Sequence, residues 1–121
     1  MHDDVVRPVD RLSTTHRVWG DGCDAWDLLS EHDLQISEEQ MPPGTIDAHH
    51  RKGAEHRFMY TIEGRLEVEV DGRGELVVQF QGLYVPANTE YRVRNPGPGR
   101  ARYLVITAPL PGASASAASV A

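Results

Sequence analysis

The sequence contains little cysteine, no long apolar run and no excess of positive charge, and each of these absences excludes a class of protein. Cys23 is the only cysteine in the 121 residues, so no intramolecular disulfide can form, which fits a reducing compartment. The most apolar run, residues 103–110, is far shorter than the roughly 20 residues that span a bilayer. A net charge of −6 opposes binding to a phosphate backbone. We therefore expect neither a membrane nor a nucleic acid as a partner.

The beginning of the chain also lacks the pattern of a signal peptide. Acidic residues stand where basic charge would be needed, and no apolar segment follows them. We therefore expect a cytoplasmic protein. With 40% hydrophobic residues, a chain of this length fits one domain that buries roughly two thirds of its unfolded surface.

Short alternating stretches between turn residues indicate an all-β protein. Residues 58–62 and 66–70 alternate well enough for two half-buried strands, and Asp71-Gly72 is a hairpin signal because glycine accepts the positive φ of such turns. Further strands are expected at residues 18–19, 25–29, 34–41, 76–80, 83–85, 91–95 and 101–107. No long stretch has the 3.6-residue period of a helix, so the pattern predicts a β-sandwich or barrel.

Both ends of the chain differ from this pattern. Residues 1–17 mix charged, proline and hydroxyl residues without a period, which indicates an N-terminal arm that pairs along a sheet edge or with a second subunit. Residues 109–121 lack the hydrophobic side chains needed to offset the ordering entropy, so we expect a disordered tail there. The barrel itself is expected to span residues 18–108.

A dense run of basic and histidine side chains, expected to lie on one strand, follows the Pro42-Pro43-Gly44 turn. Gly44, His50, Lys52, Arg57 and Gly64 occur there at a fixed spacing. This spacing resembles the first conserved motif of the cupin family, which reads Gly, five residues, His-x-His, three or four residues, Glu, six residues, Gly. Two of the three metal ligands that the motif implies are therefore replaced by cations.

A second set of residues keeps the spacing of the other cupin motif, which runs Gly, five residues, Pro-x-Gly, two residues, His, three residues, Asn. The corresponding residues are Phe80, Pro86, Asn88, Tyr91 and Asn95, so Tyr91 replaces the usual metal-binding histidine. After glycine, asparagine best tolerates a left-handed backbone, which Asn88 would need. The resemblance implies a cupin-type β-barrel, also called a jelly roll or double-stranded β-helix, and a homodimer.

Three histidines, His49, His50 and His56, lie within eight positions and raise the question of a metal, because imidazole is a common ligand for Zn, Fe, Cu and Ni. Side chains alternate between the two faces of a strand, so the three cannot share one pocket unless the strand is bulged. The motif spacing implies that His50 points inward with Lys52. A dication about 4 Å from a cationic side chain is repelled by roughly 8 kcal/mol at an effective dielectric near 20. We therefore expect no metal at the usual cupin position and no other cofactor.

The basic side chains suit a small organic anion instead. Lys52 and Arg57 would fix a carboxylate, phosphate or enolate, His50 would be the general base, and Tyr91 would be the acid, with its pKa lowered by the two cations. Metal-free cupins that isomerise or epimerise keto-sugars and related carbonyl compounds use His and Tyr in such roles. The resemblance therefore implies an isomerase, epimerase or cyclase that acts on a small anionic or enolisable oxygenated molecule, as in sugar or natural-product pathways.

Four further side chains are candidates for contact with the ligand. Glu38 and Gln40 share a strand face with Ile36, and this face is either a polar pocket wall or a solvated edge. Met59 and Thr61 lie on the Arg57 side of their strand and either line the pocket or belong to the core.

Two other functions remain open. A ligand-binding or sensory module would have the same pocket without turnover, and a metal-dependent enzyme would use ligands outside the expected positions. In a purely structural arrangement, Lys52 and Arg57 would pair with Glu38 or Glu90, and Tyr91 would fill the space of the metal. Buried cations without neighbouring acids would favour the enzyme or the binding module.

Overall fold

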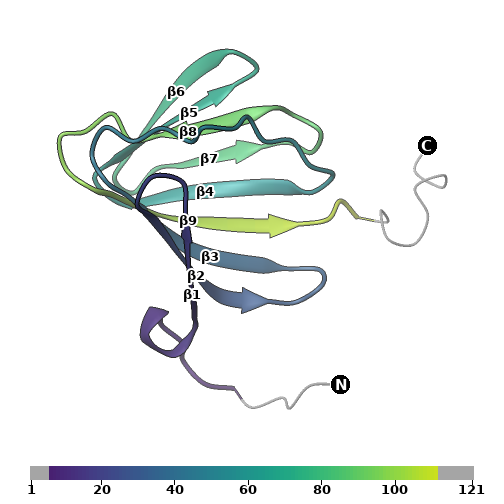
Figure 1. Cartoon of the computed structure of the whole chain (residues 1–121). Helices are drawn as coiled ribbons and strands as arrows, with labels where there is room; N and C mark the ends of the chain where they lie inside the picture. Colours follow the sequence, from purple (N-terminus) through teal and green to yellow (C-terminus); the bar gives the residue numbers. More distant parts are fainter. Residues whose placement is uncertain (1–5, 112–121) are drawn as a thin grey trace.

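The computed structural model describes residues 6–111, which form two antiparallel β-sheets. One 3-10 turn, η1 (Arg11–Ser13), precedes the strands β1 (Thr15–Trp19), β2 (Cys23–Ser30), β3 (Gln35–Met41), β4 (His56–Glu63), β5 (Arg65–Val70), β6 (Arg73–Val78), β7 (Gly82–Val85), β8 (Tyr91–Arg94) and β9 (Ala101–Ala108). The large sheet has the order β1-β2-β3-β9-β4-β7 and the small sheet the order β6-β5-β8. Figure 1 shows the strands following one another from β6 at the top to β1 at the bottom. The predicted all-β architecture is confirmed.

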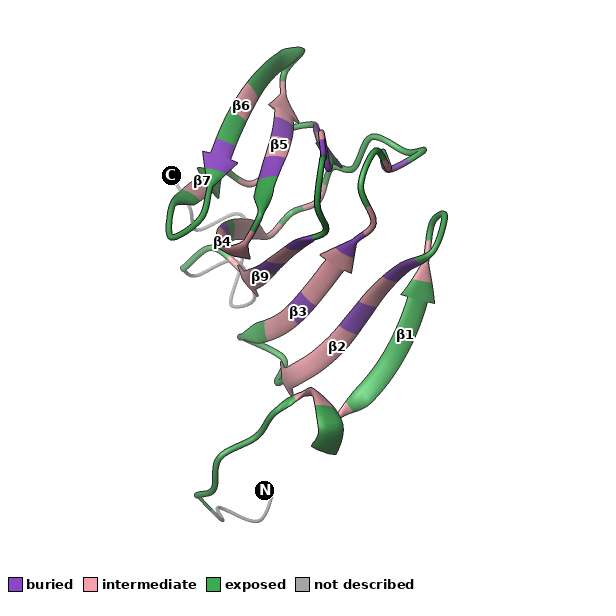
Figure 2. Cartoon of the chain, turned by 90° about the vertical axis from the view of Figure 1, so that its left-hand side faces the viewer, coloured by how far each residue is buried: buried purple, intermediate pink, exposed green. Residues whose placement is uncertain are grey.

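The two sheets face each other, and the side chains between them form the core. Met41, Met59 and Tyr103 of the large sheet and Leu66 and Val68 of the small sheet are almost fully buried. Buried positions alternate with more exposed ones at the start of β2 and along β5 (Figure 2). This alternation follows from strand geometry, because successive side chains point to opposite faces of a sheet.

Turn residues adopt the backbone conformations that the sequence predicts. Asp71 and Gly72 have φ angles of 49° and 83° and join β5 to β6, with Val70 paired directly to Arg73. Positive φ at both central residues is what a two-residue type I′ hairpin requires. Asn88, which stands at the position of a cupin glycine, has a φ of 59°. The predicted hairpin and the predicted left-handed asparagine are both confirmed.

The dense basic segment is only partly the strand that the sequence predicts. β4 begins at His56, and the backbone of residues 47–55 is irregular apart from one isolated antiparallel bridge between Arg51 and Tyr91. The two N···O distances of this bridge are 2.7 and 2.9 Å. Alanines are the only apolar residues in 47–55, so this segment has little side-chain surface to bury against a sheet. The expectation of one continuous strand is therefore wrong for its first half.

The ends of the chain are described only in part. β1 begins at Thr15, inside the segment expected to be an arm, and its first residue pairs with Asp27 of β2. Residues 1–5 of the expected arm and residues 112–121 of the expected tail lie outside the described residues. The division of the chain into an arm (residues 1–17), a barrel (residues 18–108) and a disordered tail (residues 109–121) therefore stays a prediction.

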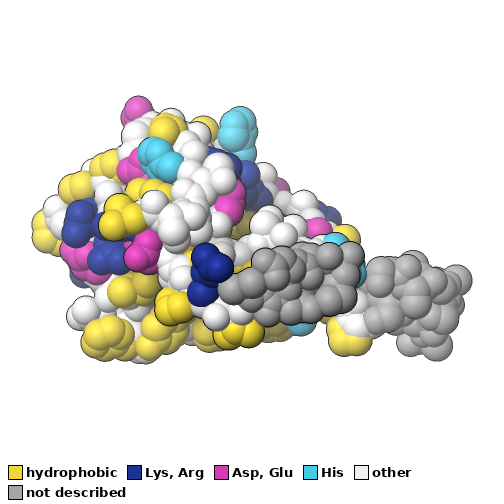
Figure 3. Space-filling model, turned by 90° about the horizontal axis from the view of Figure 1, so that it is seen from below, with side chains coloured by type: hydrophobic (Ala, Val, Ile, Leu, Met, Phe, Trp, Pro, Cys, Tyr) yellow, Lys and Arg dark blue, Asp and Glu magenta, His cyan; other side chains and the backbone are white. Residues whose placement is uncertain are grey.

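Opposite charges are intermixed on the surface. Seen from below, basic and acidic side chains lie next to one another among hydrophobic ones (Figure 3). Ion pairs between Arg100 and Glu63 and between Arg17 and Asp27 are examples. Within residues 6–111, no helix is long and apolar enough to cross a membrane.

Gly64→Ala should destabilise the fold far more than Gly72→Ala. Both glycines have a left-handed backbone, with φ of 73° and 83°, which costs an alanine about 1–2 kcal/mol. A Cβ at residue 64 would also lie 2.3 Å from the carbonyl oxygen of Arg100, whereas nothing lies within 4 Å of a Cβ at residue 72. In urea denaturation we expect losses of about 3 kcal/mol or more for the first variant and about 1 kcal/mol for the second. Equal losses would contradict this packing of the turn between β4 and β5.

Candidate functional site

A cavity of about 250 Å³ lies between the inner face of the large sheet and strand β8 of the small sheet. Its wall is built by β1, β2, β3, β4, β8, β9 and the irregular segment that contains the Arg51 bridge. The charged and phenolic side chains in this wall are Arg17, Asp27, Glu39, Asp47, Arg51, Arg57, Tyr91 and Tyr103. A concave site in which a few polar groups converge among apolar ones is typical of small-molecule pockets.

The bridge between Arg51 and Tyr91 determines which basic side chains enter the cavity. Directly paired residues of an antiparallel bridge project on the same side, so Arg51 points inward with Tyr91. The neighbours His50 and Lys52 do not belong to the cavity wall, and His50 instead approaches Glu69 at 3.6 Å. The expectation that His50 and Lys52 point inward is therefore wrong, because the local alternation is shifted by one residue.

Two of the arginines in the wall donate hydrogen bonds to carboxylates. Arg17 binds Asp27 through Nε and Nη2, at 3.0 and 2.8 Å. Arg51 binds the buried Asp47 through Nε and Nη2. In both pairs the hydrogen bond to the carboxylate is the largest cause that raises the pKa of the arginine. These two cations are therefore neutralised within the wall.

Arg57, Met59 and Tyr91 line the cavity, where the sequence places them. The guanidinium of Arg57 lies over the ring of Tyr91, 5.4 Å from its centroid. Burial raises the pKa of Tyr91, and the opposing effect of Arg57 and Arg51 is smaller. The expectation of a lowered pKa is therefore wrong in its net direction, because burial outweighs the two cations, and Tyr91 keeps its phenolic proton at neutral pH. Thr61 is fully buried in the core and donates a hydrogen bond to the carbonyl oxygen of Val77.

Glu39 is a carboxyl group in the cavity wall that the sequence did not single out. The hydroxyl of Tyr103 donates to its Oε1 at 3.1 Å, and the hydroxyl of Ser37 donates to its Oε2 at 3.2 Å. Burial is the largest influence on Glu39 and raises its pKa, while these hydrogen bonds act in the opposite direction. A carboxyl group in a cavity wall whose pKa is raised holds a proton more readily than an exposed glutamate, which suits a group that accepts and returns a proton.

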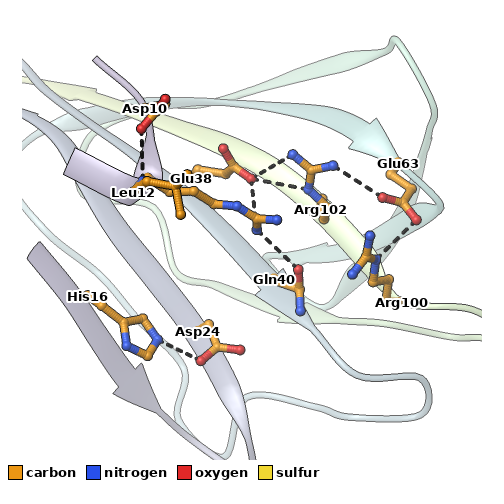
Figure 4. A network of polar contacts seen from close by, with 10 residues as sticks. Asp10, Leu12, His16, Asp24, Glu38, Gln40, Glu63, Arg100 and Arg102 are labelled. Carbon is orange, nitrogen blue, oxygen red and sulfur yellow. Dashed lines mark hydrogen bonds and ion pairs between the residues drawn. The ribbon is translucent and has the colours of Figure 1, made fainter. Parts of the chain in front are cut away.

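Glu38 and Gln40, the two expected contacts on the same strand, lie outside the cavity. Glu38 accepts hydrogen bonds from Arg102 at 2.8 and 3.1 Å and pairs with Arg11, which also donates to Gln40. Figure 4 shows this network, which continues through Arg102 to Glu63. The interpretation of this face as a pocket wall is therefore wrong for Glu38 and Gln40, whereas Ile36 at the start of the strand does line the cavity. The inward face of β3 carries Ser37, Glu39 and the fully buried Met41.

The side chains of the cavity do not fit a divalent metal ion. No histidine contributes to its wall, and within the described residues no three His, Cys, Asp or Glu side chains gather as metal ligands would. The carboxylate of Asp47 is engaged by Arg51, and that of Glu39 by two hydroxyl groups. Three guanidinium groups in the wall would repel a dication.

Replacing Glu39 by glutamine should stabilise the protein increasingly as the pH rises. In the unfolded chain Glu39 loses its proton above about pH 4.3, the ordinary pKa of glutamate. In the folded protein its pKa is raised, so the carboxyl group keeps its proton to a higher pH. Wild-type protein therefore loses stability as the pH rises through the pKa of the folded state, whereas Glu39→Gln does not. We expect the difference in Tm between the two proteins to grow from pH 4 to pH 8. Glu63→Gln should show the opposite trend, because arginines lower the pKa of Glu63, and the same trend in both variants would contradict the assignment.

Comparison with known proteins identifies the family to which this chain belongs. Residues 37–107 match the family model of the cupin domain. A protein named polyketide synthase CurC from Streptomyces cyaneus is 37% identical over 70 residues, which cover 58% of this chain and 46% of that protein. The chain thus matches about half the length of this relative.

Several solved structures share the fold. The polyketide cyclase RemF from Streptomyces resistomycificus matches with a TM-score of 0.73 and 15% identity, covering 86% of this chain and 80% of that chain. A sugar phosphate isomerase of the cupin superfamily from Silicibacter pomeroyi matches with a TM-score of 0.72 and 20% identity, covering 87% and 77%. At these identities the likeness concerns the fold. Since the family model covers more than half of the chain and the two-sheet architecture agrees with it, this chain belongs to the cupin family.

Proposed function

We propose that this cupin is a metal-independent enzyme of the isomerase, epimerase or cyclase type that transfers protons on a small enolisable carbonyl compound. The observation that carries this proposal is the position of Glu39. Its carboxyl group lies in the cavity wall, its pKa is raised by burial, and its charge influences Tyr91. Enzymes place carboxyl groups in such surroundings when these groups must exchange protons near neutral pH.

In the proposed reaction, ionised Glu39 accepts a proton from the carbon atom next to a substrate carbonyl. The electron pair of the broken C–H bond moves into the carbonyl group and gives an enolate. The phenolic hydroxyl of Tyr91 donates a hydrogen bond to the enolate oxygen. Where the enolate is conjugated with a further double bond, return of the proton from Glu39 to the far carbon completes an isomerisation. In a cyclisation, the enolate carbon attacks a second carbonyl group, whose electron pair moves onto its oxygen, and this oxygen takes the proton from Glu39 to give a ring with a hydroxyl group.

The arginines beside Tyr91 would stabilise the developing negative charge. Arg51 and Arg57 both lie close enough to lower the pKa of Tyr91 against the larger effect of burial. Fixed positive charge in a partly desolvated cavity stabilises an oxyanion without reorganisation of solvent during the reaction. His50 and Lys52, which the sequence nominated for these tasks, lie outside the cavity wall.

The relatives support a reaction of this type. A polyketide is a chain with repeated carbonyl groups, so a cyclase acting on one uses enolate chemistry. One curated relative is named a polyketide synthase, and two structural neighbours are named a polyketide cyclase and a sugar phosphate isomerase. The expected homodimer stays a prediction, which the mass of the particle in solution tests.

Deuterium exchange of 2-tetralone tests the proposed proton transfer. This bicyclic ketone carries enolisable protons next to its carbonyl group, and NMR in D₂O follows their replacement by deuterium. Wild-type protein should accelerate the exchange, and Glu39→Gln should reduce the acceleration by roughly 100-fold or more, the usual contribution of a general base. Tyr91→Phe should reduce it by about tenfold or more, because it removes one donor to the enolate oxygen.

Two further variants separate the proposal from its rivals. Glu75→Gln makes the same chemical change on β6 at a half-exposed glutamate outside the cavity wall, and it should leave the exchange rate unchanged. His50→Gln decides between the two candidate bases, since loss of exchange in this variant together with full exchange in Glu39→Gln would refute the role of Glu39. Tight binding of 2-tetralone without any accelerated exchange would identify a binding module instead.

A further inference from the structure

The charges of the cavity wall nearly cancel, with one exception. Arg17 is compensated by Asp27 through three hydrogen bonds and Arg51 by Asp47 through two. Arg57 is different, because the carboxylate with which it pairs, that of Glu55, lies 3.7 Å away and is about half exposed. Apart from its position over the ring of Tyr91, the guanidinium also donates a 3.4 Å hydrogen bond to the carbonyl oxygen of Glu55. Arg57 is therefore the weakly compensated cation of the wall.

The surroundings of Arg57 favour an anionic partner from the ligand. Its side chain is only 19% exposed, and the ring of Tyr91 covers one face of the guanidinium. A guanidinium offers five N–H donors in a planar fork that matches a carboxylate. The side chain of Glu55 is 47% exposed and is not part of the cavity wall, so a ligand carboxylate can replace it beside Arg57 without leaving a buried charge unpaired.

Among the described residues, the cavity wall has no further uncompensated cation that could pair with a second negative charge on the ligand. Glu39 becomes negative whenever it acts as a base, and Asp27 and Asp47 already occupy the other two arginines. A phosphate monoester carries close to two charges above pH 7. Its second charge would meet carboxylates rather than a free cation, and charges of like sign repel across a partly desolvated site.

The rest of the wall favours a flat molecule. Trp19 and Tyr91 contribute aromatic rings to the wall, and each ring has a planar guanidinium over one face, that of Arg51 and that of Arg57 respectively. Apolar side chains such as Met59 and Val105 complete the wall. A cavity of about 250 Å³ is slightly smaller than the range of roughly 300–1,000 Å³ that is typical of drug-sized ligands. One or two planar rings fit this size and these surfaces better than a bulky puckered one.

We propose that the substrate is a planar, conjugated or aromatic monocarboxylate whose carboxylate pairs with Arg57, and that phosphorylated substrates are excluded. This inference rests on the proposed function. It restricts the substrate class from any anionic or enolisable molecule to planar molecules with a single negative charge. It assigns Arg57 to substrate binding and charge selection.

Three naphthalene probes of similar shape test the inference by isothermal titration calorimetry at pH 8. 2-Naphthoate carries one negative charge, naphthalene-2-carboxamide none, and 2-naphthyl phosphate two. Wild-type protein should bind the carboxylate about tenfold or more tightly than either other probe. In Arg57→Gln, the affinity for 2-naphthoate should fall by about tenfold or more, while that for the amide should change less than about twofold.

Arg100→Gln is the matched control, because Arg100 forms a half-exposed pair with Glu63 and is not part of the cavity wall. This variant should bind all three probes like the wild type. Tightest binding of the phosphate, absence of binding of 2-naphthoate to the folded wild type, or an unchanged carboxylate preference in Arg57→Gln would each overturn the inference.

The two proposals can fail separately. Glu39→Gln should lose the exchange of 2-tetralone but still prefer 2-naphthoate to the amide. If the preference survives Arg57→Gln while Glu39→Gln abolishes exchange, the substrate class is wrong and the proposed reaction stands. If Arg57 controls the preference but Glu39→Gln exchanges at the wild-type rate, the reaction is wrong and the substrate class stands.

Discussion

The backbone pairing of Arg51 with Tyr91 decides which charges face the interior of this barrel. These two residues exchange both of their backbone hydrogen bonds, so their side chains must project on the same side. The bridge places Arg51 in the cavity wall, with its side chain still 47% exposed, and leaves His50 and Lys52 outside that wall. A shift of this pairing by one residue would exchange a guanidinium for an imidazole and an ammonium, with a different chemistry inside the same fold.

Burial then determines the chemical state of the groups that face the cavity. Tyr103 is fully buried and donates to Glu39, and the loss of solvent raises the pKa of both groups. Burial also raises the pKa of Tyr91, although two nearby guanidinium groups act in the opposite direction. The site thus combines a proton acceptor that is easily protonated with a phenol that keeps its proton. Such a pairing of acid and base suits enolisation, in which one group removes a proton and another stabilises the oxygen.

The fold could be predicted from the sequence because its signals are local. The alternation in residues 58–70, the Asp71-Gly72 turn and the left-handed Asn88 depend on neighbouring residues, and the structure confirms them. The spacing of the two cupin motifs also survives the loss of most of their metal ligands, because it reflects the lengths of strands and turns. Arg57 and Tyr91 reach the cavity as the motifs imply.

The orientation of the remaining site residues could not be predicted in the same way. In β3, Ile36, Glu38 and Gln40 alternate with Ser37, Glu39 and Met41, so each face holds one apolar residue and polar neighbours. The choice between the two faces is made by pairing with β9, where Glu39 stands opposite Tyr103. Likewise, the direction of Arg51 depends on a partner forty positions later in the sequence. One signal was available, because a methionine at the end of a strand is commonly buried and would have turned Glu39 inward.

We propose that arginine side chains and a partly buried carboxyl group perform inside this barrel the task that the cupin motifs imply for a coordinated ion. Elemental analysis of the purified protein, combined with the 2-tetralone exchange rate before and after treatment with a chelator, tests it most directly. The account predicts far less than one equivalent of Fe, Mn, Ni, Cu or Zn per chain and an exchange rate that the chelator leaves unchanged. A stoichiometric metal whose removal abolishes the exchange would contradict it.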